Sequence, residues 1–260
     1  MAAIGASLTF ALALFLLIPP PAAQGRVTEL TTQLSALDPA VRAKAACELR
    51  ELGSAASPAL DPLVALLADA APLAQPVCGR NWWRGHPNNL TTPGEQAASA
   101  LVAIGTPAFK PLLGALEHAS WVARRHAAWA LGALDDQRAT PGLVRAMRDP
   151  ESGVREQAAW ALGALSDEAG VPAIVDGLRD QDPRVREQSA WAAGALDDRR
   201  AVEPLLGALT DREAGVREQA CWALGAIGDE RALHRLLPAL KDPDARVRRQ
   251  AAWAVGVLGR

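Results

Sequence analysis

The stretch that decides the fold spans residues 154–184 and reads VREQAAWALGALSDEAGVPAIVDGLRDQDPR. Its pattern returns along the chain with a period of 31 residues. Three residue types keep that period without a slip: Trp129, Trp160, Trp191, Trp222 and Trp253; Gly132, Gly163, Gly194, Gly225 and Gly256; Arg124, Arg155, Arg186, Arg217 and Arg248. A fixed period in this range indicates one supersecondary unit copied in tandem, not a fold built around one central core.

Each repeat carries the apolar stripes of two helices. The first stripe has the spacing i, i+4, i+7, i+8, i+11 of an amphipathic helix and consists of Val154, Ala158, Ala161, Leu162 and Leu165. A second stripe follows at Val171, Ile174, Val175 and Leu178. Polar residues at 166–168 suit a turn, and Asp182 before Pro183 suits a helix cap followed by proline at the first helical position. The sequence therefore predicts an all-α fold, an α-solenoid of antiparallel helix pairs with about 31 residues per repeat.

Two of the periodic columns predict contacts between repeats. Gly163 lies late in a first helix, where glycine costs about 1 kcal/mol relative to alanine. We therefore expect a neighbouring helix to approach closely at this column. An aspartate column, in the turn before each arginine, consists of Asp149, Asp180, Asp211 and Asp242. We expect these aspartates to face the arginines of adjacent repeats and to form a charge ladder that fixes the geometry between repeats.

The repeated stretch resembles HEAT repeats of the short, phycobilin-lyase-like type, whose pattern is similar to V-R-x-x-A-A-x-A-L-G-x-[IL]. The similarity is strong over residues 123–260, recognisable over residues 95–120, and also covers residues 41–66. The resemblance implies a right-handed superhelix with first helices on the convex side and second helices on the concave side. Residues 27–37 are then expected to form the second helix of an N-terminal half-repeat.

The first 25 residues have a different composition from the repeats. They contain no charged side chain, and an apolar run from Ile4 to Ile18 is followed by three prolines and by the small-x-small pattern of residues 23–25. The run is shorter than the roughly 20 residues that span a bilayer as a helix. Residues 1–25 are therefore interpreted as a cleaved signal peptide or an uncleaved N-terminal anchor, with an apolar tail as the third alternative. Either of the first two places residues 26–260 in the periplasm or outside the cell.

An insertion interrupts the period between the first two repeats. Its predicted range is Pro72–Gly94, which is rich in Pro, Gly and Asn and contains Arg80, Trp82, Trp83 and Arg84. Insertions in a solenoid emerge on one face and often bind a partner. These four residues are therefore candidates for partner binding. The alternative is that the two tryptophans cap the apolar end of the first repeats.

The last 14 residues, 247–260, form a first helix with no second helix after it. We expect its apolar residues to be half covered: Val247, Ala251, Ala254, Val255 and Leu258. Two interpretations remain open, a truncated sequence or an edge that docks on another chain.

The tryptophan column is predicted to lie on the outer face of the first helices. At about 100° per residue, Trp160 points roughly 140° away from the core stripe. One interpretation is packing between repeats, in which each indole lies over polar side chains of the next repeat, and the other is a ligand-binding aromatic stripe. The nearest candidates for this packing are Gln157, Gln188, Gln219 and Gln250. The candidate partner-binding residues of this face are Trp129, Trp160, Trp191, Trp222 and Trp253.

Composition and motifs favour binding over catalysis. A formal net charge of −2 provides no basic face for nucleic acid. The three cysteines form no CxxC pair or zinc spacing. The His-Glu dipeptides that hold iron in HEAT-repeat deoxyhypusine hydroxylases do not occur in this sequence.

We therefore expect a non-catalytic scaffold for a protein or peptide partner, without a cofactor or metal and without nucleic acid. Membrane contact is expected only through an uncleaved anchor. The alternatives are an enzyme-accessory or lyase-like protein with a bound pigment or metal, and a structural spacer.

Overall fold

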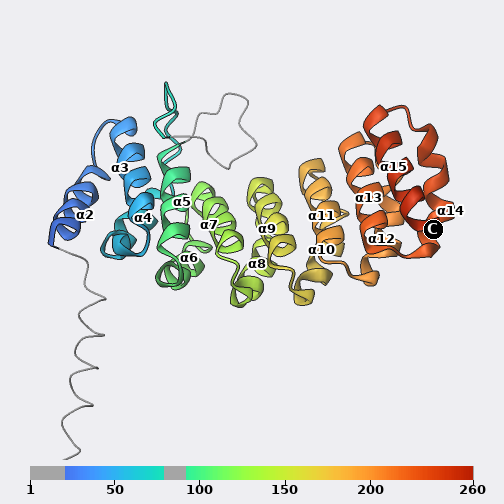
Figure 1. Ribbon diagram of the computed structural model, residues 1–260, viewed down its shortest axis with the longest axis horizontal. Coiled ribbons are helices and arrows are strands. Elements are labelled where there is room, and N and C mark those ends of the chain that lie inside the picture. The colour runs from blue at the N-terminus through green and yellow to red at the C-terminus, as the bar shows by residue number, and fades with distance from the viewer. Residues whose placement is uncertain (1–20, 79–91, 260) are drawn as a thin grey trace, which may run out of the picture. The chain divides into compact units, whose positions relative to one another are not determined.

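The computed structural model describes residues 21–78 and 92–259 (Figure 1). Contacts divide the chain into two bodies, residues 1–108 and residues 109–260. The regular structure of the described residues consists of α-helices and short 3₁₀-helices. The all-α prediction is confirmed. None of the helices in these described ranges is long and apolar enough to cross a membrane.

The N-terminal body begins with three α-helices. They are α2 (Pro21–Gln33), α3 (Pro39–Leu52) and α4 (Leu60–Leu66), with the 3₁₀-helix η1 (Gly53–Ala59) between the last two. Helix α5 (Pro93–Ile104) and η2 (Thr106–Ala108) complete the body. Helix α2 begins six residues before the predicted range 27–37, within the segment assigned to the signal peptide or anchor, and ends four residues before Leu37. Because α5 begins at Pro93, the last two residues of the predicted insertion belong to this helix.

The C-terminal body repeats the same helix pair. The first helices are α7 (Trp121–Ala133), α9 (Ser152–Leu165), α11 (Pro183–Ala195), α13 (Ala214–Ile227) and α15 (Ala245–Leu258). The second helices are α6 (Phe109–Ala115), α8 (Thr140–Ala146), α10 (Val171–Gly177), α12 (Val202–Ala208) and α14 (Leu233–Leu236). The 3₁₀ segments are η3 (Gln137–Ala139), η4 (Glu168–Gly170), η5 (Arg199–Ala201), η6 (Glu230–Ala232) and η7 (Leu237–Lys241).

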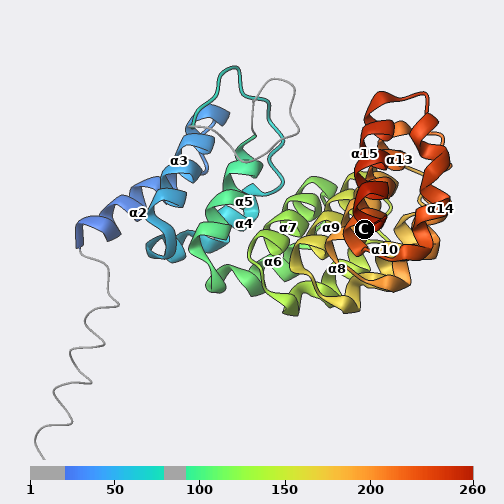
Figure 2. The same cartoon turned by 45° about the vertical axis from the view of Figure 1, so that its right-hand side comes forward.

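Within this body the first helices pack side by side in chain order, and each second helix packs against the first helix that follows it. Figure 2 shows the helices of this body from a second direction. The predicted core stripe of α9 is confirmed, since all five of its residues are buried. Three of the four residues in the second stripe are buried as well, whereas Val175 is half-buried. The periodic pattern therefore identified the packed faces correctly.

Local signals explain where the helices begin and end. The Asp182 side chain accepts a hydrogen bond from the Arg184 N–H and caps α11, with Pro183 at the first helical position, as predicted. Helix α9 ends at Leu165, and its C-cap residue Ser166 adopts the left-handed conformation with φ of 50°. The next residue, Asp167, then caps η4. Part of each second helix is thus a 3₁₀ turn, and the α-helical segment that follows is short.

The arginine and aspartate columns form a ladder, but each side-chain pair lies within one repeat, whereas the sequence predicted pairs between adjacent repeats. Nε and Nη2 of Arg155 donate to the two carboxylate oxygens of Asp180 at 2.7 and 2.8 Å. Its Nη1 donates to the Asp149 carbonyl at 2.8 Å, in the turn before α9. Each arginine therefore joins the turn before its own helix to the turn that ends its repeat. The same contacts join three further pairs: Arg124 with Asp149, Arg186 with Asp211, and Arg217 with Asp242.

These aspartates carry their charge in the folded protein. Burial alone would raise the pKa of Asp180. Hydrogen bonds from Arg155 and from the Asp182 N–H outweigh this effect and lower the pKa. The pKa of Asp149 and that of Asp211 are lowered in the same way. The ladder is thus a partly buried, hydrogen-bonded ionic network and not a set of loose surface pairs.

The expectation for the last helix is wrong for four of its five apolar residues, and only Val255 is half-buried as expected. Val247, Ala251, Ala254 and Leu258 of α15 are buried because they pack against α13, α14 and η7. The exposed large apolar residues of this helix are instead Trp253 and Val257.

Candidate functional site

The tryptophan column lies at the surface of the C-terminal body, where each indole contacts a neighbouring first helix. A Cβ placed on Gly163 would lie 2.8 Å from Cζ3 of Trp191 and 2.9 Å from Cα of Ala192. A substituent at Gly194 would meet Trp222 and Ala223 equally closely, at 2.6 and 2.8 Å. Each indole edge and the backbone beside it thus occupy the space over a glycine. The predicted close approach at the glycine column is confirmed.

The direction of this contact is toward the preceding repeat. Trp160 approaches Gly132 and Trp253 approaches Gly225, each one repeat earlier. The rings of Trp129 and Trp160 also stack, with centroids 6.5 Å apart and planes 17° apart. Packing over the glutamines stays a prediction, because the close contacts that define the indole positions are with glycine.

The indoles are neither core residues nor free side chains. Trp129, Trp160, Trp191 and Trp222 are half-buried, and Trp253 is 43% exposed. The prediction that the column lies away from the core stripe agrees with this burial. A glutamate precedes three of these indoles by one helical turn: Glu156, Glu187 and Glu218. We call the surface formed by these eight residues the first-helix face.

In the N-terminal body, Cys47 takes the place of the tryptophan and forms a disulfide with Cys78. The sequence pattern did not predict this bond, since a separation of 31 residues has no meaning for cysteine pairing. The available signal was one cysteine in the first repeat and one in the insertion that follows it, in a chain expected to be exported. The bond attaches the segment after α4 to α3.

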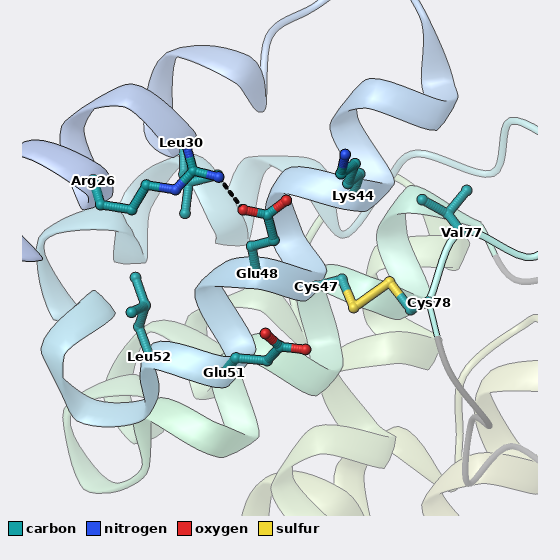
Figure 3. Close-up of a pocket in the computed structure, with 9 residues that line it drawn as sticks. All are labelled: Arg26, Leu30, Lys44, Cys47, Glu48, Glu51, Leu52, Val77 and Cys78. Carbon is teal, nitrogen blue, oxygen red and sulfur yellow. Dashed lines mark hydrogen bonds and ion pairs between the residues drawn. A yellow bond between two sulfur atoms is a disulfide. The ribbon is translucent and has the colours of Figure 1, made fainter.

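A cavity of about 420 Å³ opens beside this disulfide (Figure 3). Its wall is mixed apolar and charged and is formed by Arg26, Leu30, Lys44, Cys47, Glu48, Glu51, Leu52, Val77 and Cys78. Arg26 is bonded to Glu48 across one side. Lys44 and Glu51 add one further charge of each sign, so the charged side chains of the wall balance.

The other predicted site residues, Arg80, Trp82, Trp83 and Arg84, lie outside the described residues, as does the apolar run of residues 4–18. Among residues 21–78 and 92–259, no three or more His, Cys, Asp or Glu side chains are grouped so as to hold a metal ion. His118 occupies the aspartate position of its turn, and its Nδ1 accepts a hydrogen bond from the Ser120 N–H.

Comparisons with solved structures support the fold. Kap121p matches with a TM-score of 0.70 and 15% identity, over 92% of this chain and 30% of its own. Kap95p, the yeast importin-β, matches in its complex with RanGDP with a TM-score of 0.65 and 16% identity, over 94% of this chain and 38% of its own. This chain thus spans about one third of the length of either protein. Both likenesses confirm the helical solenoid.

The CpcE–CpcF complex of phycocyanin lyase from Nostoc sp. is 25% identical with a TM-score of 0.49, over 88% of this chain and 93% of its own. No match was found among curated protein sequences. A family model described as HEAT repeats matches residues 109–180 and 171–256, more than half of the chain. The chain belongs to the HEAT-repeat family.

Proposed function

We propose that this chain is a non-catalytic scaffold that binds a protein partner through its first-helix face, outside the cytoplasm. The observation that carries the proposal is the row of half-buried indoles on a frame held by arginine–aspartate pairs. A row of this kind presents apolar area at regular intervals along several repeats. Affinity then comes from an extended surface and not from one enclosed pocket.

Tryptophan is suited to such a surface because its ring is large and its conformational freedom is small. Contact with glycine on one side fixes the ring further, so little side-chain entropy is left to lose on binding. Tryptophan and arginine are also the residues that most often dominate interface energies. The solved complex of Kap95p with RanGDP shows that a protein of this fold holds a protein partner.

Two observations support a location outside the cytoplasm. The apolar segment at residues 4–18 has the length of a signal-peptide core. The Cys47–Cys78 disulfide is a kind of bond that persists in oxidising compartments and is rare in the cytosol. Rapid alkylation of thiols in intact cells tests this point. Export predicts that Cys47 and Cys78 resist alkylation until a reductant is added, whereas immediate labelling of both would argue for a reducing compartment.

A crosslinking pull-down from the native envelope tests the binding face. The variant is Trp160→Leu/Trp191→Leu/Trp222→Leu, and the control is Leu240→Ala, which alters an exposed residue of η7. A specific partner should be recovered with the control and lost with the triple variant, provided that both unfold cooperatively. Recovery of the same proteins with both would contradict the proposal. Visible absorbance or stoichiometric metal in the purified protein would also contradict it.

A further inference from the structure

One column of the first helices alternates between glycine and arginine. It lies in the first turn of each helix and consists of Gly153, Arg184, Gly215 and Arg246. The glutamates of the first-helix face come three residues later in α9, α11 and α13. Each of these glutamates faces the alternating column of the next repeat.

Where the column holds arginine, the arginine lies beside the glutamate of the preceding repeat. Nη1 of Arg184 is 3.9 Å from Oε2 of Glu156. Nε of Arg246 is 3.7 Å from Oε2 of Glu218. The repeat therefore has a standard arrangement at this place, a carboxylate with a guanidinium from the next first helix.

Glu187 lacks this arginine because Gly215 stands at the corresponding position. Its carboxylate lies over the glycine, where an added Cβ would come within 2.8 Å of Cδ of Glu187. Among the described residues Glu187 makes no ion pair or hydrogen bond. The side chain is nevertheless solvent-accessible. A partner can thus reach a carboxylate that has no ion pair within residues 21–78 and 92–259.

The surroundings of Glu187 favour a cation. Burial against α13 raises the pKa of Glu187, and the nearby carboxylates of Glu218 and Glu156 raise it further, while Arg246 opposes them. Trp191 follows Glu187 by one helical turn on the same face of α11. An indole beside a carboxylate attracts a guanidinium both through its ring and through the adjacent charge.

We infer that Glu187 and Trp191 of the first-helix face, together with the adjacent Gly215, bind an arginine side chain of the protein partner. The partner's guanidinium lies beside Glu187 as Arg184 lies beside Glu156 and Arg246 beside Glu218. This inference rests on the proposed function and adds to it the chemistry of the partner: a basic, arginine-bearing segment.

The sharpest test introduces the arginine into the protein itself, at position 215. Gly215→Arg gives this repeat the residue that two neighbouring repeats already carry, so the variant should fold with an unchanged melting temperature. Its control is Gly153→Arg, which adds the same charge where the nearest side chains are Trp121 and Arg125 and not a glutamate. The probe is a fluorescein-labelled 12-residue peptide of alternating glycine, serine and arginine, followed by fluorescence anisotropy at physiological salt.

Gly215→Arg should raise the Kd of this peptide at least about tenfold, and Gly153→Arg should leave it within about twofold. Glu187→Gln should raise the Kd of the peptide about threefold to tenfold. Its control, Glu203→Gln on α12, should leave the Kd unchanged. The inference fails if the native protein does not bind the peptide, or if variant and control weaken binding equally.

The native pull-down separates this inference from the proposed function. If Gly215→Arg and the native chain recover the same partner equally well, the arginine site is wrong and the scaffold remains. If neither chain recovers a partner, the scaffold itself is contradicted.

Discussion

The first repeat of the N-terminal body and the repeats of the C-terminal body share one contact and differ in another. In both, an arginine joins the turns before and after its repeat. Nε of Arg42 donates to Asp69 at 2.6 Å and Nη1 donates to the Ala36 carbonyl at 2.7 Å. The tryptophan position, in contrast, holds Cys47 in the first repeat, and a disulfide replaces the indole contact.

The difference shows that the two contacts have separate tasks. The arginine–aspartate pair fixes the turns and is present whether or not an indole is. The glycine–tryptophan pair sets how closely first helices approach, and it requires both members. In the N-terminal body Arg50 stands at the glycine position of α3, and the tryptophan position of the next first helix, α5, is the small Ser99. In each body, therefore, only one of the two positions, glycine or tryptophan, holds a large side chain.

The largest expected effect comes from the contact that only the N-terminal body has. Cys47→Ala/Cys78→Ala opens a loop of 31 residues and should lower the free energy of unfolding by about 3–4 kcal/mol. Denaturant unfolding followed by circular dichroism measures the change. A reductant should destabilise the native protein and leave the double variant unchanged. An equal free energy of unfolding of the native protein with and without reductant would show that the disulfide does not stabilise the fold.

The shared contact should come next. Arg186→Leu leaves the carboxylate of Asp211 and the carbonyls of Asp180 and Gln181 without their donor, which should cost about 2–3 kcal/mol. The control is Arg212→Leu, because Arg212 is exposed and lies 3.7 Å from Glu213; its effect should be below about 0.5 kcal/mol. Urea unfolding of the two variants side by side decides the matter. Similar midpoints would mean that the ladder does not stabilise the fold.

The glycine–tryptophan contact predicts effects of opposite sign at two equivalent glycines. Gly194→Ala places a methyl group against the Ala223 backbone and the Trp222 ring and should destabilise by about 1–2 kcal/mol. Nothing lies within 4 Å of a Cβ at Gly256, so Gly256→Ala should stabilise by up to about 1 kcal/mol through helix propensity alone. Thermal unfolding gives both signs. Stabilisation by both substitutions would show that the glycine column is not needed for the close approach of first helices.

The smallest effect is the response of the ladder to acid. Because the folded-state pKa of Asp211 is below its usual value, its ionic contribution is fully present above about pH 4 and is lost as pH falls through the folded-state pKa. The stability difference between the native protein and Asp211→Asn should therefore narrow between pH 5 and pH 3. Urea midpoints measured at half-unit pH steps give this difference. A gap that stays constant or widens would contradict the charged pair.

Much of the fold could be predicted because its causes are local or periodic. The core stripe of α9, the cap at Asp182 and the arginine–aspartate ladder all follow from residues whose spacing repeats. The register between neighbouring first helices does not follow from spacing, since it depends on how the packed helices slide. The sequence therefore indicated the outer position of Trp160 but not its contact with Gly132 of the preceding repeat.

The remaining misses have the same origin in tertiary contacts. The pairing of Cys47 with Cys78 depends on how the segment after α4 returns to α3. The burial of Val247 and Leu258 depends on η7 and α14, which cover a stripe expected to be half open. Glu187 could not be distinguished by its own helix, because α11 has the same sequence pattern as α9 and α13. Its distinction lies in Gly215, one repeat later.

The proposed function places the partner on the first-helix face, so the second helices are expected to make no contact with it. A photo-crosslinking amino acid placed at Ala226, exposed on α13 one turn after Trp222, tests this placement directly against the same group at Glu203, exposed on α12. In the native host, we expect a discrete crosslinked protein from position 226 that disappears in the Trp160→Leu/Trp191→Leu/Trp222→Leu background, and none from position 203. Products from position 203 alone, or equal products from both positions, would contradict the claim.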